Sequence, residues 1–348
     1  MECSNKSSIS SLPITTERVA YLDLLRVIAT FGVIFLHVAG TDYYTPIMQY
    51  NWYIAVIGDS LVRWSVPIFV MISGVLFLNP HKNITIHGIL TKYVPRLLTA
   101  YLFWYIIYVI KDTLIVSYYK RAFTFERSFL VPEFHLWFLP MLMGVYLLIP
   151  FLRKIVVSEK LMRYALCIWF VYITVSFVLV YEIPQISQLF SKNLVLGYAG
   201  YFLLGYYLSK TITKRQQAVF IFLGLFGIIV TIICSIAFSI QRGVVTEKFL
   251  DNLSPNVSMM AMSLFVLIKN NTPRIEKKTK YFIEYVRKDL FGIYLVHSIW
   301  LWVFNRPIFR NITDHLFTIM IITIVIFVCS LYTIKIMRLI LILRRVVE

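Results

Sequence analysis

The sequence has little charge for a chain of its length. Only 15% of its 348 residues are charged, whereas a soluble globular protein carries about 25%. Hydrophobic residues make up 59% of the chain, and the mean hydropathy is +0.76. Too few polar side chains remain to cover a water-soluble core. The composition therefore excludes a soluble enzyme and a disordered protein, and it predicts a polytopic membrane protein.

Cysteine is scarce too, and its spacing gives no redox or metal signal. The four cysteines are widely scattered, form no C-x-x-C, and three of them lie inside apolar runs. They are typical of small core hydrophobes rather than of a disulfide framework or a zinc site. The motifs GxxxxGK(S/T), GxGxxG, GxSxG and HExxH are also missing. We therefore expect no bound metal, no separate cofactor and no nucleic-acid partner.

Apolar stretches recur along the whole chain, and most reach the roughly 20 residues that a membrane-spanning helix needs. Residues 1–18 are polar and form the expected lead, without a cleaved signal peptide, while residues 19–348 form one membrane domain. We predict an all-α bundle of about ten transmembrane helices. The expected spans are 19–40, 52–79, 93–117, 135–152, 161–181, 193–210, 216–240, 255–269, 288–305 and 315–343.

Lysine and arginine are divided unevenly between the two sets of loops. If the N-terminus is cytoplasmic, 23 of them face the cytoplasm and nine face outward, while Arg26 and Arg63 fall within spans. Cytoplasmic loops of membrane proteins carry the excess of positive residues. The pattern predicts a multi-pass protein of the inner or plasma membrane with both termini in the cytoplasm. Most of the net charge of +17 is then a cytoplasmic excess.

The first span carries charged residues at costly positions. Arg26 and His37 are eleven residues apart, so they project from one helix face about 16 Å apart. Asp23 can pair with Arg26 but lies roughly 21 Å from His37, which excludes a relay within this helix. Considered alone, Arg26 is typical of an arginine whose charged end reaches the membrane surface, and His37 is typical of a hydrogen-bonded core histidine. Their shared face favours a functional role.

The second span carries an ion pair. Asp59 and Arg63 are four residues apart and can neutralise one another in the membrane. Pro67 follows, and its missing amide hydrogen permits a kink where a cavity can open. A structural ion pair that locks two helices explains the pattern as well as a functional site does.

Polar residues also lie at the ends of later spans. Lys92 and Arg96 begin the third span, where they suit phosphate groups but equally fit ordinary flanking charge. Glu133, His135 and Trp137 stand at the outer mouth of the fourth span, where they suit a sugar-binding mouth or an interfacial aromatic belt. His297, in the middle of the ninth span, is a substrate-binding candidate or a core histidine.

Several motifs, in this order and spacing, resemble acyltransferase family 3, the integral-membrane O-acyltransferases, and in particular its surface-polysaccharide O-acetyltransferase branch. The resemblance covers essentially everything beyond residue 18. It rests on D-x-x-R (Asp23, Arg26), R-x10-H (Arg26, His37), the Asp59/Arg63 helix ending VPIFVMISGVL, the basic pair Lys92 and Arg96, HLWFLPMLMGVYLLIP (His135–Pro150), GYFLLGYYLS (Gly200–Ser209) and GIYLVH (Gly292–His297).

The resemblance implies transfer of an acyl group, most commonly acetyl, from cytoplasmic acyl-CoA to a hydroxyl of a cell-surface or lipid-linked carbohydrate. It implies that His37 is the catalytic histidine and Arg26 its partner, whereas Lys92 and Arg96 match the family's basic motif only in part. Some members carry an appended esterase-like domain, which we do not expect in this chain.

The residue types fit this chemistry on their own terms. Histidine is the natural base near neutral pH, and arginine stabilises a developing oxyanion. We expect His37 to deprotonate the acceptor, Asp59 to orient its ring, and Arg26 and Arg63 to hold the CoA end or the thioester oxygen. A transient acyl-imidazole on His37 is an open alternative. The rival functions are a transporter or flippase of a polysaccharide precursor, which predicts internal repeats that we do not find, and a non-catalytic scaffold.

Overall fold

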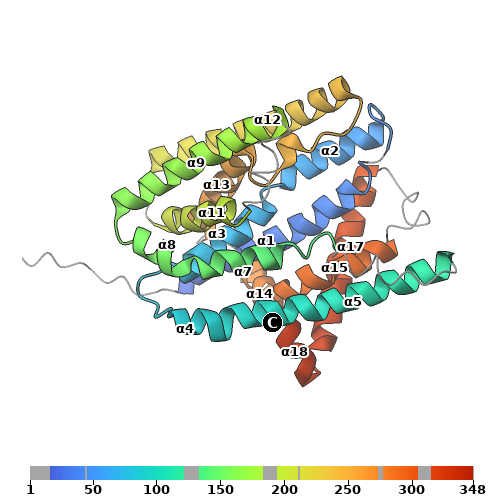
Figure 1. The fold of residues 1–348 in the computed structure, drawn as a ribbon. Helices are drawn as coiled ribbons and strands as arrows, with labels where there is room; N and C mark the ends of the chain where they lie inside the picture. Colours follow the sequence, from blue (N-terminus) through green and yellow to red (C-terminus); the bar gives the residue numbers. More distant parts are fainter. Residues whose placement is uncertain are drawn as a thin grey trace, which may run out of the picture.

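The chain folds into helices that pack as one bundle (Figure 1). The computed structural model describes residues 16–43, 45–120, 133–182, 194–210, 212–272, 277–304 and 315–347, and within these ranges every regular element is helical. The all-α prediction is confirmed. The elements are α1 (Thr16–Gly40), α2 (Tyr50–Val62), α3 (Ser65–Phe77), α4 (Ile86–Gly88), the π-helix η1 (Ile89–Tyr93), α5 (Val94–Lys120), α7 (Phe138–Leu147), α8 (Ile149–Ile155), α9 (Glu159–Glu182), α11 (Leu194–Ser209), α12 (Lys214–Arg242), the 3-10 helix η2 (Lys248–Leu250), α13 (Pro255–Asn271), α14 (Lys277–Val286), α15 (Leu290–Phe304), α17 (His315–Met337) and α18 (Leu341–Val347).

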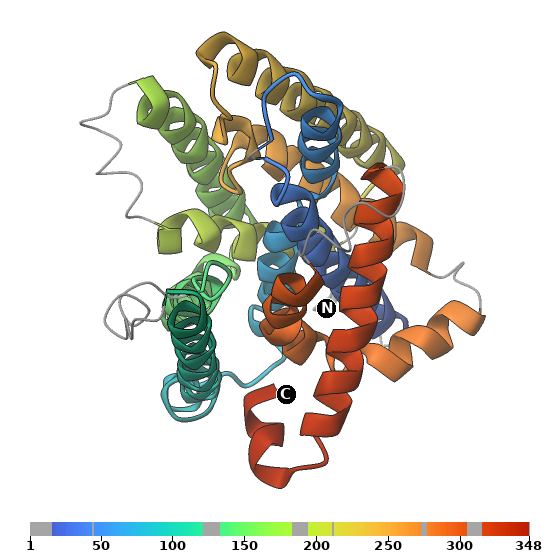
Figure 2. The same ribbon diagram turned by 90° about the vertical axis from the view of Figure 1, so that its right-hand side faces the viewer.

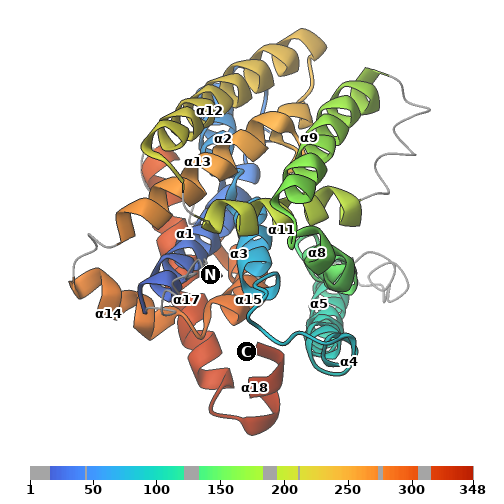
Figure 3. The same ribbon diagram turned by 90° about the vertical axis from the view of Figure 1, so that its left-hand side faces the viewer.

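Helix α1 lies at the centre of the bundle. It packs against α2, α3, α15 and α17, and Figure 3 shows it between α3 and α17 with α5, α9 and α12 around the outside. In its most apolar 18-residue window, 67% of α1 is buried inside the protein, compared with 17% for α9 and 22% for α12. The helix that carries Arg26 and His37 is therefore an interior helix, shielded from lipid by its neighbours.

Helices α3 and α11 approach one another closely enough for backbone contact. A Cβ atom on Gly74 would lie 1.9 Å from the carbonyl oxygen of Phe202, and one on Gly205 would lie 2.1 Å from that of Met71. Small residues at such crossings are the usual means of packing helices in membranes, because they let backbones meet. This contact fixes α3, and with it the residues of α3 that face the site described below.

The second expected span is interrupted where the sequence predicted a kink. Helix α2 ends at Val62 and α3 begins at Ser65. Pro67 has no amide hydrogen to donate to the carbonyl of Arg63, which is the residue four positions earlier. The helical hydrogen bonding lapses at this point, where Arg63 and Trp64 lie between α2 and α3, although both residues keep helical dihedrals and Tyr50–Phe77 still forms one span.

Helices fall on all ten of the expected spans, but not all are long enough to cross a membrane. By length and apolar composition, six helices of the described residues qualify, with α2 and α3 counted as one span, or seven if the pair α7 and α8, bent by 57°, is also one span. Helices α11, α13 and α15 have only 16, 17 and 15 residues. The count of ten and the side of the termini therefore stay predictions. Of the expected polar lead, only residues 16–18 lie in the described part, where they begin α1.

Apolar side chains cover the outer faces of the peripheral helices. They recur at intervals of three or four residues, so each helix turns one continuous apolar face outward. A surface of this extent is typical of contact with lipid. Representative exposed residues are Leu98, Leu102, Ile106 and Ile110 on α5, Tyr164, Ile168, Val171 and Val175 on α9, Phe222, Phe226, Ile229 and Ile233 on α12, and Phe317, Met320, Ile324 and Val328 on α17.

The C-terminal helix folds back beside the end of α17 (Figure 2). The indole nitrogen of Trp104 on α5 donates a hydrogen bond to the carbonyl oxygen of Val346 at 3.2 Å. Helices α5 and α18 are thus joined, although 242 residues separate the two partners in sequence. This contact places α18 beside a cavity that residues of α1, α3, α5 and α15 line.

Candidate active site

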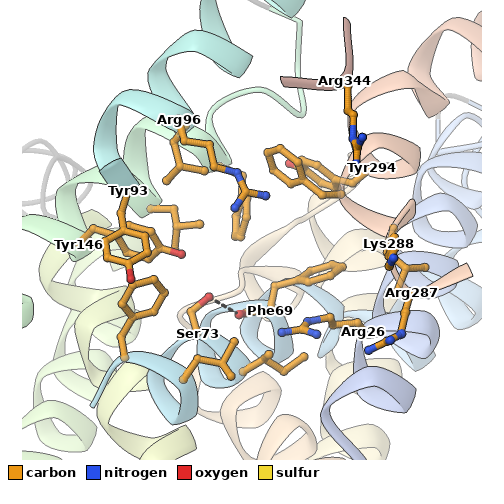
Figure 4. A pocket seen from close by; sticks show the side chains of 18 residues that line it. Arg26, Phe69, Ser73, Tyr93, Arg96, Tyr146, Arg287, Lys288, Tyr294 and Arg344 are labelled. Atoms are coloured by element: carbon orange, nitrogen blue, oxygen red, sulfur yellow. Dashed lines mark hydrogen bonds between the residues drawn. The ribbon is translucent and has the colours of Figure 1, made fainter. Parts of the chain in front are cut away.

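Five cationic side chains line a cavity of about 620 Å³. Arg26 comes from α1, Arg96 from α5 and Arg344 from α18, while Arg287 and Lys288 come from the junction between α14 and α15. Figure 4 shows these side chains on opposite sides of the same space. None of the described residues that line it is acidic. We call it the basic cavity; its charge suits an anionic ligand.

Two of these cations, Arg26 and Arg287, are close to the carboxylate of Asp23. Asp23 lies 2.5 Å from the guanidinium of Arg26 and 3.7 Å from that of Arg287. The pair between Asp23 and Arg26 that the sequence predicted is therefore present. Lys82, in the loop before α4, has its pKa lowered by partial burial and by the nearby Arg26, so another cation lies close to Arg26.

The inner wall of the basic cavity is aromatic. Phe69, Phe138 and Tyr294 line it, and their ring centroids lie 5.5 to 6.1 Å from one another. The hydroxyl of Tyr294 donates a hydrogen bond to the carbonyl oxygen of His135 at 2.6 Å. Its ring lies 5.9 Å from that of His297. The residues that close the cavity therefore touch a second group of polar residues.

Three histidines from separate segments meet behind this aromatic wall. His37 of α1 stacks on His297 of α15, with ring centroids 5.4 Å apart and an interplanar angle of 17°. His135, in the turn before α7, makes an edge contact with His297 at 4.9 Å. The ring of Phe134 covers His37 at 4.6 Å. We call His37, His135 and His297 the histidine cluster.

Two members of the histidine cluster are held by backbone carbonyls. Nδ1 of His297 lies 2.6 Å from the carbonyl oxygen of Tyr294, and Nε2 of His135 lies 3.3 Å from that of Leu295. Both rings are buried, and the other nitrogen of each has no hydrogen-bond partner among the described residues. His37 is only half-buried, so it is the member of the cluster open to a substrate.

Glu133 lies beside the histidine cluster. Its carboxylate accepts a hydrogen bond from Ser298 at 2.6 Å and pairs with Lys111 at 2.9 Å. Ser298 follows His297 directly in α15. Of the predicted outer group, Glu133 and His135 thus lie beside His297, whereas the ring of Trp137 packs against Tyr198 at 5.7 Å.

Asp59 and Arg63 form the predicted ion pair on α2, and Tyr43 completes it. Both Arg63 and the hydroxyl of Tyr43 donate hydrogen bonds to the carboxylate of Asp59. The side chain of Asp59 is 0% exposed and that of Arg63 is 17% exposed. Asp59 was expected to orient the ring of His37. Its Oδ2 accepts from Arg63 and Tyr43, and its Oδ1 is buried without a partner among the described residues.

Lys92 and Arg96, the two basic residues predicted at the start of the third span, lie in different surroundings. Arg96 lines the basic cavity, whereas the ammonium of Lys92 lies 5.6 Å from the ring centre of Tyr93 and does not belong to the lining. The π-helix η1, which ends at Tyr93, changes the register between them. One irregular turn of this kind often occurs at a functional site.

The sequence analysis missed several residues of the site. It counted Arg287, Lys288 and Arg344 only as flanking positive charge, although they line the basic cavity. Tyr43 and Tyr294 gave no signal, because single tyrosines are common in membrane proteins. The one available hint was that Arg287 and Lys288 directly precede the helix of His297.

A family model described as an acyltransferase domain, that of acyltransferase family 3, matches residues 19–334. Searches of curated proteins and of solved structures gave no match. The matched range contains the whole histidine cluster, the Asp59 pair and every cation of the basic cavity except Arg344. Together with the lipid-facing helices, this match makes the chain a multi-pass membrane protein with acyltransferase activity: it belongs to acyltransferase family 3.

Proposed function

We propose that the protein transfers an acyl group, most simply acetyl, from acyl-CoA to a hydroxyl of a cell-surface or lipid-linked carbohydrate. The observation that carries this proposal is the basic cavity, whose aromatic wall borders the histidine cluster. Acyl-CoA combines several phosphates with a thioester on a long neutral arm. The cations of the basic cavity therefore suit the phosphates of this donor, and the neighbouring histidine suits its thioester. Acyl-CoA is a co-substrate here, and we propose no further cofactor.

The phosphates of the donor suit the cationic side chains of the basic cavity, among them Arg26 and Arg96. Arg26 and His37 are eleven residues apart on α1, which corresponds to about 16 Å along the helix. The neutral arm of CoA then runs past Phe69, Phe138 and Tyr294, and its thioester reaches His37.

The chemistry needs a base and a positive charge near the thioester. In our proposal His37 removes the proton from the acceptor hydroxyl as its oxygen bonds to the acyl carbon. The carbon–sulfur bond then breaks, and the proton passes from His37 to the leaving thiolate. Arg63, which lies between α2 and α3, stabilises the negative oxygen that forms in between. A covalent acyl-imidazole on His37 remains the alternative route for the same overall transfer.

In our proposal the acceptor approaches past Glu133, His135 and Trp137, the residues expected at the outer mouth of the fourth span. With the basic cavity at the cytoplasmic face, as the positive residues of the loops predict, the acceptor side faces outward. We therefore propose a protein of the inner or plasma membrane with both termini in the cytoplasm. Such an arrangement takes the acyl group across the membrane while CoA stays inside.

One assay distinguishes acyl transfer from transport of a polysaccharide precursor. Purified protein in lipid vesicles is given radiolabelled acetyl-CoA and a candidate glycan or lipid-linked sugar. The proposal predicts release of free CoA that depends on the glycan, with the label recovered as a base-labile ester on the glycan. Movement of the lipid-linked sugar across the membrane without ester formation would establish the rival flippase. Among the described residues, the one apolar helix pair bent by more than 40° is α7 and α8, in the first half of the chain, whereas repeat transporters carry interrupted helices at matching positions in both halves.

A further inference from the structure

We propose that His297 is a positioning residue that orients His37, by accepting a hydrogen bond from the ring N–H of His37 at its Nε2 atom. This inference rests on the proposed acyl transfer at His37. It gives His297 a role different from the substrate contact that its place in the sequence suggested.

The tautomer of His297 follows from its backbone partner. Nδ1 of His297 lies 2.6 Å from the carbonyl oxygen of Tyr294, one turn earlier on α15. A carbonyl oxygen only accepts hydrogen bonds, so Nδ1 carries the proton. The ring is 0% exposed, and a second proton on Nε2 would be an unpaired buried charge, which is costly. His297 is therefore neutral, with a lone pair on Nε2.

That lone pair lacks a donor in the described structure. Nε2 of His297 is buried and has no hydrogen-bond partner among the described residues. Buried polar atoms without partners are rare in native proteins, and each calls for an explanation. The ring that stacks on His297 is that of His37, with centroids 5.4 Å apart. The ring of His135 lies closer, at 4.9 Å. Its Nε2 faces the carbonyl oxygen of Leu295 and carries the proton, so Nδ1 of a neutral His135 is an acceptor as well. The donor therefore falls to His37.

The stacked arrangement needs one small change to form this bond. The two rings are nearly parallel, at 17°, so a ring N–H of His37 does not yet point at Nε2 of His297. His37 is half-buried, and a rotation of its ring about the side-chain torsions turns the N–H toward its neighbour. Catalytic hydrogen bonds are often long or poorly aligned without substrate and tighten in the complex.

The remaining surroundings favour His297 over Asp59 for this role. Oδ2 of Asp59 accepts hydrogen bonds from both Arg63 and Tyr43, while its Oδ1 is buried without a partner among the described residues. Of the two candidates, His297 is the one whose ring stacks on that of His37. His297 is also fixed on both sides: its Nδ1 is held by Tyr294, and its ring rests on the edge of His135 at 4.9 Å. A rigid neutral acceptor beside His37 selects one tautomer of the catalytic ring and stabilises the proton that this ring receives during transfer.

Two substitutions at His297 distinguish the roles of its two ring nitrogens. His297→Asn keeps a donor near the Nδ1 position for the carbonyl of Tyr294 but removes the acceptor at Nε2. His297→Gln reaches the Nε2 position with an amide oxygen that can accept from His37. We expect His297→Asn to lower kcat by about 100-fold or more with an unchanged KM for acyl-CoA. We expect His297→Gln to recover at least about tenfold of that loss.

The kinetic outcomes are decisive when both variants keep the thermal stability of the wild-type protein. Equal losses in kcat for the two variants, or a rise in the acceptor KM with kcat unchanged, would overturn the positioning role. His37→Ala serves as the reference: if it is inactive while His297→Asn is fully active, only this inference fails. If His37→Ala is itself active, the proposed function fails as well.

A spectroscopic measurement tests the same inference without relying on a folded variant. In wild-type protein with nitrogen-15-labelled histidine, the signals of His297 report which ring nitrogen carries the proton. The inference predicts protonation at Nδ1, the less common tautomer of free histidine, and a shift of the Nε2 signal when a non-hydrolysable acyl-CoA analogue binds. A proton on Nε2 in the free protein would overturn it.

Discussion

The hydroxyl of Tyr43 donates a hydrogen bond to the buried carboxylate of Asp59. The bond ties the segment after α1 to α2, and Arg63 supplies the charge that balances Asp59. Breaking a buried pair on one side leaves a charge without compensation, whereas replacing both partners with apolar residues is often tolerated. This difference allows the structural and the catalytic roles of the pair to be measured separately.

The ion pair yields the first prediction. Asp59→Ala should destabilise the protein by about 3–5 kcal/mol, because it leaves the guanidinium of Arg63 buried and unpaired. The double variant Asp59→Leu/Arg63→Met should regain most of the stability but remain inactive, because it lacks the positive charge near the thioester. Thermal unfolding in detergent measures the first effect and acetyl transfer the second. An active double variant would show that the pair is only structural.

The basic cavity yields the second prediction. Lys288→Gln and Arg344→Gln should each raise the KM for acyl-CoA about tenfold or more with little change in kcat, since a hydrogen bond to a charged group contributes about 1.5–3 kcal/mol. Arg163→Gln is the matched control, because Arg163 pairs with Glu159 on the exposed surface of α9. Calorimetric titration with CoA checks the affinities directly. Unchanged KM values for both variants would contradict the assignment of the donor to this cavity.

Glu133 yields the third prediction. Its carboxylate contacts Ser298 and Lys111 beside the histidine cluster, and Glu133 does not line the basic cavity. Glu133→Gln keeps the size of the side chain but weakens its ability to accept hydrogen bonds from sugar hydroxyls. We expect the KM for the glycan to rise while the KM for acyl-CoA stays the same. Steady-state kinetics with each substrate varied in turn decide the point, and a selective rise in the donor KM would place Glu133 on the other side of the reaction.

The contact between α3 and α11 yields the fourth prediction. A Cβ on Gly74 would lie 1.9 Å from a backbone carbonyl of α11, and rigid backbone cannot move aside as a side chain can. Gly74→Ala should therefore separate the two helices and reduce the yield of folded, monodisperse protein. Gly40→Ala is the control, because the nearest atoms to its new Cβ lie 3.8 Å away. Equal yields and melting temperatures for the two variants would contradict the close packing.

The sequence alone predicted the helices and several candidate residues, but it did not predict which residues of distant helices meet in the folded protein. Charges within an apolar run stand out, so Arg26, His37 and the Asp59 pair were identified directly, and helical spacing gave the shared face of Arg26 and His37. Arg344 could not be recognised, because a cation at a helix end looks the same whether it flanks a membrane or lines a cavity. The stacking of His297 on His37 was equally hidden, since 260 residues of chain separate them. Only the packing of α15 against α1 brings them together.

The count of spans shows the same limit. Periodicity and length predicted ten helical segments, yet α15, which carries His297, has only 15 residues. A short helix of this kind is positioned by its neighbours rather than by its own hydrophobic length, so its place in the bundle could not be read from its sequence.

The measurement that tests the central claim most directly compares wild-type protein with His37→Ala, using purified protein, radiolabelled acetyl-CoA and a glycan acceptor. Binding of CoA is measured on the same samples. The wild-type protein should bind CoA and transfer label to the glycan. His37→Ala should bind CoA with the same affinity, because the cationic side chains of the basic cavity are intact, and should transfer no label. Transfer by His37→Ala at the wild-type rate would contradict the account.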